Sequence, residues 1–335
     1  MSGGIRANAS LVSLSFKAPS RVVTSRELEA RLGLGPGVIE RLTGIRARRY
    51  LGPGESLQSL AVEACREALA RSGRRPEEIG GLIFYTDTPP LLPCAGGYRQ
   101  VYYDVSAHLH DLLREQGVRL ECGCTSIGGS CVAFLHSLEM ASGLIRSGAR
   151  DNILVVGAAA NSLFLEGTDK NAAMTFADGA AAGLVASSAE EGLIGFHALT
   201  DGRGYDAGYY EDYRTLVVDR KRVAEFAPAA LAEAWTGLLA RTGLTVDDID
   251  VVIPHQAGIK IVERGMALAG IPSEKVYLCL QDYGNMGAPA VEMALAKAVE
   301  DGRVRDGDVV ALVAFGTGWN CGAAALRYRA GGGRR

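Results

Sequence analysis

Two stretches of this chain, half a chain length apart, decide its fold. Residues 64–85 read ACREALARSGRRPEEIGGLIFY, and residues 234–255 read AWTGLLARTGLTVDDIDVVIPH. They align without a gap at an offset of 170 residues (234 − 64 = 170), with Gly73 and Gly243 in register. Each copy has the pattern of an amphipathic helix, a glycine stop, an acidic turn and a short buried strand. The pair therefore indicates duplication of an α/β unit.

A second pair of stretches supports the duplication. The helical pattern FLHSLEMASGLIRSG is followed by the apolar run NILVVGA, and AVEMALAKAVEDG is followed by DVVALVAFG. Aligning Gly148 with Gly302 gives an offset of 154 residues (302 − 148 = 154). The same offset places Cys131 opposite Asn285.

The strand patterns predict how the halves are built. Runs such as ILVVG and VVALVAF are continuously apolar, which is typical of strands that helices cover on both faces. They alternate with helical patterns of 12–18 residues, which predicts βαβ units and mostly parallel sheets. We expect an α/β protein with two duplicated βαβαβ-type halves, residues 1–187 and 188–335. Segments 89–118 and 201–225 are polar and irregular, which predicts surface loops. Active-site loops are often of this kind.

Composition excludes several classes of function. Of 335 residues, 48% are hydrophobic and 22% are charged, which is typical of a globular chain and not of a disordered one. The net charge of −3 provides no basic field for nucleic acid, and no apolar run reaches the roughly 18 residues of a membrane span. The N-terminus has no signal-peptide pattern, and seven irregularly spaced cysteines predict free thiols. We therefore expect a cytoplasmic protein without nucleic-acid or membrane partners.

Cys131 is the strongest candidate nucleophile. It follows the small-residue turn Gly128-Gly129-Ser130 and opens a helix predicted over residues 132–147. Free N–H groups and the positive end of the helix dipole favour a thiolate at such a position. Taken alone, however, a cysteine among small residues also fits a plain core position.

Three further features lie at predicted strand or helix ends. His255 follows a buried strand, at the edge where open α/β sheets place their ligands, although a structural histidine fits equally well. Asn285 follows Gly284 and precedes a helix, as an N-cap residue also does. The glycines of FGTGWNCG (315–322) either form a turn or bring a backbone N–H close to a reacting oxygen.

Taken together, these features resemble the β-ketoacyl-acyl-carrier-protein synthase III family of the thiolase superfamily. The resemblance covers nearly the whole chain and is most specific at the PHQ and YGN motifs. It is carried by TGIRARR (43–49), LIFYTDTPP (82–90), SCVAFLHSLEMASGLIRSG (130–148), ILVVGA (153–158), TFADGAAAGLV (175–185), PHQAGIKI (254–261), YGNMGAPA (283–290) and DGDVVALVAFGTGWNCGAAALRY (306–328). It implies a thiolase fold with a layered αβαβα core.

The resemblance also implies a mechanism. Cys131 would take an acyl group from a thioester, and His255 and Asn285 would stabilise the enolate formed when a malonyl thioester loses CO₂. The oxyanion hole would comprise the Cys131 amide and the loop of Gly316, Thr317 and Gly318. The implied partners are an acyl thioester on coenzyme A or acyl carrier protein, a malonyl thioester and a second copy in a homodimer, with no cofactor and no metal.

The chain departs from acetyl-CoA-primed members of the family. Val38 and Leu42 occupy the positions of a stacking Trp and a pairing Arg, Leu163 replaces a further Arg, and Gly258 replaces an Asn. These changes weaken a coenzyme A adenine site. Segments 89–118 and 204–213 differ from the family pattern as well. The sequence thus favours a specialised, natural-product type of enzyme.

Residues Val132-Ala133 replace the family's small residue and glycine, a change that could reshape the oxyanion hole.

Two further groups of residues include types that bind metals or acidic partners. His108, His110, Cys122 and Cys124 include metal-binding residue types but lack the spacing of a zinc site, so we expect no metal. Lys260 and Arg264, one helical turn apart, form either a basic docking spot for an acidic carrier protein or a solvated helix face.

Two other functions compete with condensation. An acyltransferase would form the same acyl-Cys131 and pass it to an alcohol or amine without making a carbon–carbon bond. A non-catalytic subunit would only shape the pocket of another synthase. The Cys–His–Asn set argues against the subunit, and Asn285 favours condensation because enolate stabilisation is the step that needs it.

Overall fold

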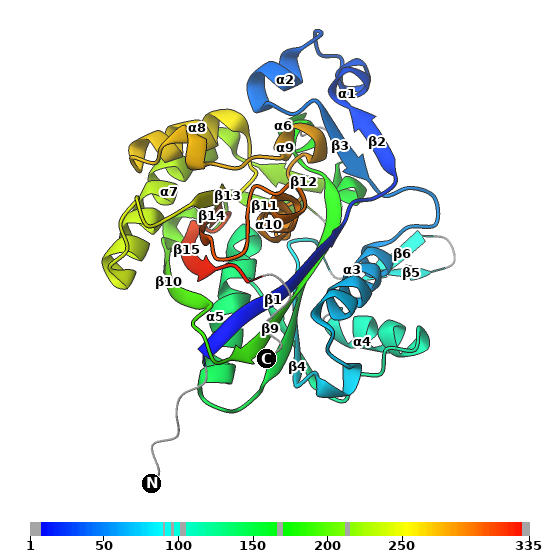
Figure 1. Ribbon diagram of the computed structural model, residues 1–335. Coiled ribbons are helices and arrows are strands. Elements are labelled where there is room, and N and C mark those ends of the chain that lie inside the picture. The colour runs from blue at the N-terminus through cyan, green and yellow to red at the C-terminus, as the bar shows by residue number, and fades with distance from the viewer. Residues whose placement is uncertain are drawn as a thin grey trace.

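Two mixed β-sheets organise the molecule (Figure 1). The computed structural model describes residues 8–89, 91–94, 97–100, 105–165, 170–211 and 215–329, with the backbone alone for 91–94 and 97–100. The first sheet has the order β1-β9-β8-β4-β7. Its strands are β1 (Asn8–Lys17), β4 (Gly81–Tyr85), β7 (Gly123–Ile127), β8 (Asn152–Ala160) and β9 (Asp178–Ser188).

The second sheet repeats the first with one strand fewer. Its order is β10-β15-β14-β13, so β10, β15, β14 and β13 correspond to β1, β9, β8 and β4. The strands are β10 (Leu193–Thr200), β13 (Val251–Pro254), β14 (Val309–Gly316) and β15 (Asn320–Arg327). The repeated order confirms the duplicated halves predicted from the sequence. The predicted division at residue 187/188 falls at the end of β9, and the two-domain description stays a prediction.

The expectation of mostly parallel sheets was wrong. The β4–β7, β4–β8 and β13–β14 pairs are parallel, as predicted. The β1–β9, β8–β9, β10–β15 and β14–β15 pairs are antiparallel. The physical reason is clearest at β14 and β15, because the three-residue turn between them is far too short for a parallel crossover.

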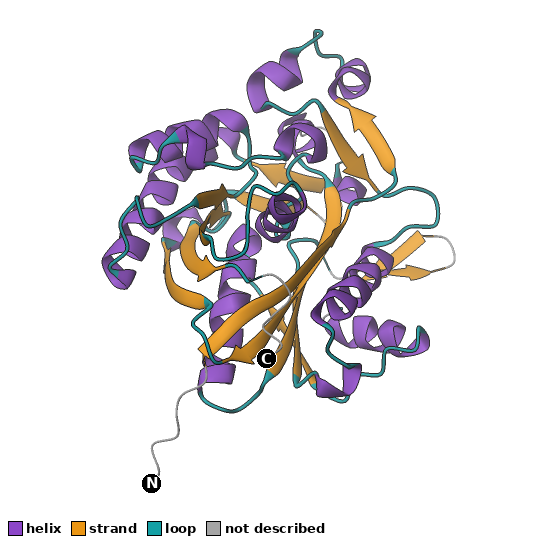
Figure 2. Ribbon diagram, in the orientation of Figure 1, coloured by secondary structure: helices purple, strands orange, loops and turns teal. Residues whose placement is uncertain are grey.

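Helices cover both sheets and also fill the space between them (Figure 2). Between the sheets lie α5 (Ala133–Arg146) and α10 (Ala290–Glu300), whose buried residues join both sheets in one core. The outer face of the first sheet packs on α3 (Leu57–Ser72) and α4 (Ser106–Glu115). The outer face of the second packs on α7 (Arg220–Thr242) and α8 (Ile259–Leu268). The layers are those of a thiolase fold, αβαβα.

The remaining elements are short and lie around the two sheets. The strands are β2 (Arg21–Thr24), β3 (Ala47–Tyr50), β5 (Leu91–Cys94), β6 (Gly97–Gln100), β11 (Gly208–Glu211) and β12 (Thr215–Val218). The helices are α1 (Ser25–Leu32), α2 (Val38–Thr43), α6 (Lys170–Thr175) and α9 (Leu280–Tyr283). Single 3₁₀ turns occur at Pro76–Glu78, Ser130–Val132, Asn161–Phe164, Gly202–Gly204 and Ser273–Lys275.

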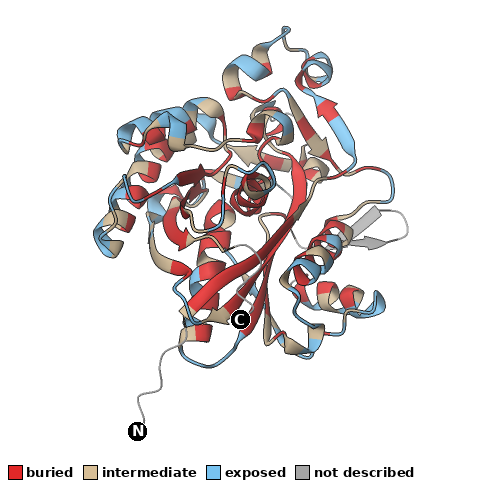
Figure 3. Ribbon diagram, viewed as in Figure 1, coloured by how far each residue is buried: buried red, intermediate tan, exposed pale blue. Residues whose placement is uncertain are grey.

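Burial follows this layering. The long strands β1 and β9 are buried over most of their length (Figure 3). Helix α10 is buried on nearly every side, and its four alanines allow close approach of both sheets. None of the described helices combines the length and the apolar character that crossing a membrane requires.

One carboxyl group is buried inside this apolar core. Glu292 of α10 is fully buried and accepts a hydrogen bond from the hydroxyl of Tyr85 on β4. Its second oxygen, Oε1, has no hydrogen-bond partner. Burial raises the pKa of Glu292 to about 8, against the opposing hydrogen bond from Tyr85. The core therefore holds a proton on this carboxyl at neutral pH.

Replacing Glu292 should change how stability depends on pH. The folded protein binds a proton at Glu292 that the unfolded chain releases near its ordinary pKa of 4.5, so stability falls as pH rises from about 4.5 to about 8. The Glu292→Gln variant lacks this proton, and wild type should lose roughly 1 kcal/mol per pH unit relative to it across that window. Urea unfolding of both proteins at several pH values measures the difference, and parallel curves contradict the assignment.

Candidate active site

The backbone before Cys131 holds the sulfur at the start of a helix. Gly129 has a φ of 130°, and a Cβ there would lie 2.8 Å from a ring carbon of His136, so glycine is required. Ser130 has a φ of 53°, an uncommon value for a residue with a side chain. The turn Ser130–Val132 then leads into α5. The predicted helix is therefore present, one residue shorter at each end and preceded by a 3₁₀ turn.

The Cys131 thiol is buried and has one polar neighbour in its own turn. The Ser130 hydroxyl lies 3.7 Å from Sγ and 3.1 Å from the Thr317 hydroxyl. Burial raises the pKa of Cys131, and the negative charge of Asp87 raises it further. This direction is opposite to the one expected from the helix terminus alone, because desolvation outweighs the helix dipole. The resting sulfur is therefore a neutral thiol that must release its proton when it attacks.

The end of β14 approaches the Cys131 amide. A Cβ added to Gly316 would lie 3.0 Å from the Cys131 nitrogen and 3.1 Å from Cβ of Ser130, so only glycine fits without displacement. Gly318, with a φ of 82°, belongs to the tight turn between β14 and β15. Cys131, Gly316 and Thr317 line one cavity, whereas Gly318 does not line it. The four-residue oxyanion hole stays a prediction, with Gly318 supporting the turn.

His255 directly follows β13 and is held as a neutral ring. Its backbone N–H donates to the Val313 carbonyl of β14 at 2.8 Å. The ring stands edge-on to Phe315, with 5.4 Å between centroids. Burial lowers the pKa of His255 to about 3, and its Nδ1 has no hydrogen-bond partner. A neutral imidazole can donate a hydrogen bond to an oxygen without carrying a charge.

Asn285 is fixed by the N-terminal half although it belongs to the C-terminal half. Its N–H donates to the Thr175 carbonyl at 3.0 Å, and its carbonyl accepts from the Ala177 N–H at 2.8 Å. The side-chain Oδ1 accepts from the Gly287 N–H at 2.9 Å. This contact leaves the two N–H bonds of the carboxamide as donors. Asn285 is 4% exposed, so those donors point into a largely desolvated site.

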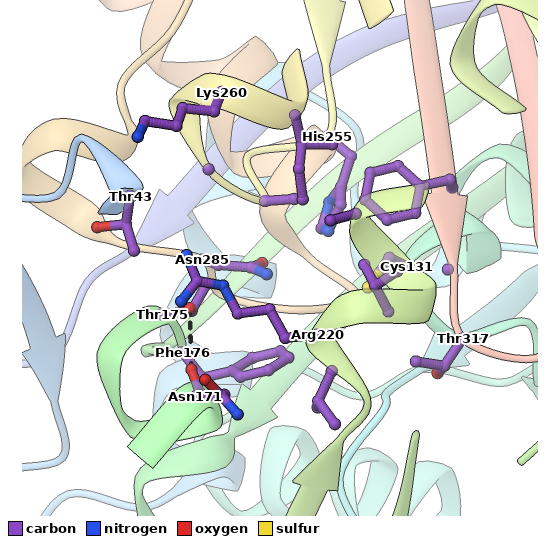
Figure 4. Close-up of a pocket in the computed structure, with 18 of the residues that line it drawn as sticks. Thr43, Cys131, Asn171, Thr175, Phe176, Arg220, His255, Lys260, Asn285 and Thr317 are labelled. Atoms are coloured by element: carbon purple, nitrogen blue, oxygen red, sulfur yellow. Dashed lines mark hydrogen bonds between the residues drawn. The ribbon is translucent and has the colours of Figure 1, made fainter. Parts of the chain in front are cut away.

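The three predicted catalytic residues line one cavity of about 220 Å³ (Figure 4). Cys131 comes from the start of α5, His255 from the end of β13, and Asn285 from the segment before α10. The exposed residues Lys260 and Arg220 also line it, so two positive charges lie toward its solvent side. The cavity could therefore hold a ligand with an anionic group outside and a carbonyl group inside.

A second cavity of about 210 Å³ also reaches Cys131. The two cavities share Cys131, Phe176, Val218 and Thr317. The rest of the second lining is Thr86, Asp87, Ser130, Asn161, Gly208, Tyr209, Tyr210 and Leu216. Cys131 thus lines both the cavity that contains His255 and Asn285 and a second cavity that does not. This arrangement suits a nucleophile that receives one group and presents it to a second.

Several of these lining residues were missed by the sequence analysis. Arg220, Asn161 and Tyr210 carry no motif of their own, and Asp87 lies in the motif LIFYTDTPP (82–90) without a role predicted for it. The only signals were the irregular segment 201–225, which does supply part of both cavities, and the position of Asp87 just beyond β4. Segment 89–118 lies partly outside the described residues, so its predicted role as a pocket loop stays a prediction.

The other positions singled out in the sequence are dispersed. Lys260 and Arg264 are both exposed on α8, but only Lys260 lines the cavity. Leu42 and Gly258 line it as well, whereas Val38 begins α2 and Leu163 lines neither cavity at Cys131. Leu42, Gly258, Val38 and Leu163 are the positions at which this chain departs from the acetyl-CoA-primed members of the family.

The residues considered for a metal site do not gather into one. The ring of His110 pairs through Nε2 with the Leu120 carbonyl at 2.9 Å. Among the residues that the structure describes, no three His, Cys, Asp or Glu side chains gather as a metal site would require.

Comparisons with known proteins show the family to which the chain belongs. Residues 126–202 match the family model "3-Oxoacyl-[acyl-carrier-protein (ACP)] synthase III", and residues 239–328 match the model of its C-terminal part. A β-ketoacyl-[acyl-carrier-protein] synthase III of Rhizorhabdus wittichii is 33% identical, over 92% of this chain and 96% of that protein. The chain belongs to the β-ketoacyl-acyl-carrier-protein synthase III family.

Solved structures place this family member in the same fold. The 3-oxoacyl-[acyl-carrier-protein] synthase III of Aquifex aeolicus superposes with a TM-score of 0.87 and 27% identity, covering 96% of this chain and 100% of that one. The priming β-ketosynthase of the R1128 polyketide pathway gives a TM-score of 0.88 and 27% identity, covering 98% and 99%. The protein is a ketosynthase III-like condensing enzyme, and acyl transfer without carbon–carbon bond formation is not favoured.

The electrostatics of Cys131 can be tested by alkylation. Because the resting thiol is neutral, its reaction rate with iodoacetamide should still rise between pH 8 and pH 9 and show no plateau near pH 7. Asp87→Asn removes a charge that raises the pKa of Cys131, so this variant should react several-fold faster at pH 8. Peptide mass mapping separates Cys131 from the other cysteines.

Asp111→Asn is the matched control, because Asp111 is exposed and forms an ion pair with Arg114 on α4. A plateau near neutral pH, or equal rates in wild type and Asp87→Asn, contradicts this account of the site.

Proposed function

We propose that this enzyme uses Cys131, His255 and Asn285 for a decarboxylative Claisen condensation between an acyl thioester and a malonyl thioester. The observation that carries the proposal is the single cavity that these three side chains line, although they lie far apart in the sequence. A sulfur nucleophile next to two uncharged hydrogen-bond donors matches what the reaction needs at each step.

The first step is acylation of Cys131. The sulfur attacks the thioester carbonyl, its proton leaves with the departing thiol, and the acyl group remains on Sγ. The approach of Gly316 to the Cys131 amide supports an oxyanion hole formed by that amide and by the loop of Thr317. Since the second cavity also ends at Cys131, we assign the acyl chain to it.

The second step is decarboxylation and carbon–carbon bond formation. The malonyl thioester enters the first cavity with its carbonyl oxygen toward the His255 ring and the Asn285 amide. Loss of CO₂ leaves an enolate whose negative oxygen those two donors stabilise. The carbon then attacks the acyl-Cys131 carbonyl and expels the Cys131 sulfur, which takes up a proton from solvent to return to the thiol. His255 is suited to this role because a pKa of about 3 keeps the ring neutral throughout.

Carrier delivery is part of the proposal. Lys260 and Arg220 line the solvent side of the cavity, and Arg264 is exposed on the helix that carries Lys260. Positive charges there would attract the phosphate of a pantetheine arm and the acidic surface of a carrier protein. Homodimer formation and a cytoplasmic location stay predictions from the sequence.

Substitutions should separate the two steps. Cys131→Ala should abolish acyl loading. Asn285→Ala should load normally but release CO₂ from a malonyl thioester about 10²–10³-fold more slowly, as when one oxyanion donor is lost. Intact-protein mass measures loading, and labelled CO₂ measures decarboxylation. Cys122→Ala, which changes a partly buried cysteine that lines neither cavity at Cys131, is the control for loading. If wild type loads an acyl group but releases no CO₂ from a malonyl thioester, the result contradicts condensation and indicates simple acyl transfer.

Charge reversal on α8 should affect carrier-bound substrates only. Arg264→Glu removes a positive charge outside the cavity, so KM for a malonyl carrier protein should rise about tenfold while KM for malonyl pantetheine stays constant. Arg75→Glu, at an exposed site that does not line the cavity, should change neither value. Equal effects on both substrates contradict carrier docking at α8.

A further inference from the structure

The second cavity contains a carboxylate that the condensation does not use. Asp87 lies two residues beyond the end of β4 and lines the cavity together with Cys131. One of its oxygens, Oδ2, accepts a hydrogen bond from the Ala288 N–H at 2.9 Å. The other, Oδ1, is buried and has no hydrogen-bond partner.

The loop after Asn285 keeps this carboxylate in place. A Cβ added to Gly287 would lie 1.9 Å from Oδ2 of Asp87, so the backbone there approaches as closely as glycine allows. The fold therefore anchors one side of the carboxylate through Ala288, and the buried Oδ1 on the other side has no partner within the protein. No basic side chain forms an ion pair with Asp87 among the described residues.

The polar groups beside Asp87 already have partners within the protein. The Tyr210 hydroxyl donates to the Asp87 backbone carbonyl at 2.8 Å and lies 3.5 Å from Oδ1 of Asn161. The amide of Asn161, which is fully buried, donates to the Ala177 carbonyl at 3.1 Å. The Ser130 and Thr317 hydroxyls pair with each other. Oδ1 of Asp87, in contrast, is a buried side-chain acceptor without a partner.

This composition does not suit a plain alkyl chain. A buried, unpaired carboxylate oxygen costs free energy that contact with a methyl or methylene group cannot offset. Burial also raises the pKa of Asp87 to about 7, against the opposing hydrogen bond from the Ala288 N–H. A ligand that supplied a donor to Oδ1 would remove this penalty.

We propose that the second cavity selects an acyl primer carrying a hydrogen-bond donor, a hydroxyl or an ammonium group close to the thioester, which pairs with Oδ1 of Asp87. The inference rests on the proposed function, because it assigns the acyl chain on Cys131 to this cavity. It specifies the primer as a 3-hydroxyacyl or 3-aminoacyl group in place of an unsubstituted alkanoyl group. The same donor pairing applies to both, and the experiment distinguishes them.

Matched thioesters test the proposal. Butanoyl, 3-hydroxybutanoyl and 3-aminobutanoyl pantetheine differ in one substituent, and intact-protein mass gives the rate at which each loads Cys131. At least one substituted primer should load wild type about tenfold or more faster than butanoyl pantetheine, as expected for a hydrogen bond to a charged group. The ammonium primer should load fastest if Asp87 binds it as a carboxylate anion. The hydroxyl primer should load fastest if the Asp87 carboxyl stays neutral.

Two variants attribute the preference to Asp87. Asp87→Ala should load the substituted and unsubstituted primers at equal rates. Asp87→Asn retains an oxygen that can accept the Ala288 N–H, so a folding defect is not expected in this variant. It should lose the preference for the ammonium primer. Ratios between primers are compared because either change also alters the reactivity of Cys131. Asp111→Asn, at an exposed position on α4, should keep the wild-type ratios.

The outcomes separate this inference from the proposed function. Loading of butanoyl pantetheine as fast as both substituted primers overturns the inference and leaves the condensing role of Cys131 intact. Primer ratios that do not change in Asp87→Ala and Asp87→Asn also overturn it. Failure of all three primers to load Cys131 overturns both the proposed function and the inference.

Discussion

The backbone hydrogen bonds of Asn285 are the interaction on which the site depends. Its N–H and carbonyl pair with Thr175 and Ala177, which lead into β9 of the other half of the molecule. Two sheets that only packed against each other could slide by a fraction of a side chain, whereas paired peptide groups fix a register. The carboxamide of the C-terminal half is thereby held within the cavity that contains the thiol of the N-terminal half.

The central helices explain why both halves contribute to one site. Helices α5 and α10 lie between the sheets and share one core with both of them. Cys131 and Asn285 precede these helices at pseudo-equivalent positions, so the duplication that builds the fold also brings these two predicted catalytic residues together. His255 follows from the same rule, because it lies just beyond the end of β13, parallel to β14. The loop after β14 then reaches the Cys131 amide through Gly316.

Desolvation sets the chemistry of this site more than local dipoles do. It keeps His255 neutral, raises the pKa of the Cys131 thiol, and leaves Asp87 with a pKa of about 7. A neutral imidazole and a neutral amide suit a reaction whose charge develops on the substrate oxygen. Burial of an aspartate near a nucleophilic sulfur opposes thiolate formation, so its presence needs a compensating role, and a polar primer provides one.

The sequence by itself determined the duplication and the α/β class, because glycine stops and apolar runs are local properties. Its motifs carry the family resemblance, which predicts the αβαβα layers and the Cys–His–Asn set. It could not determine that the sheets are mixed, since the direction of a strand depends on which strand it pairs with. It also missed the second cavity. Asp87, Asn161 and Tyr210 lie in different segments of the chain, and only the folding of β4, the turn at 161–164 and β11 around Cys131 brings them together. Likewise, a helix terminus could be predicted for Cys131, but the burial that reverses its effect on the thiol arises from tertiary packing.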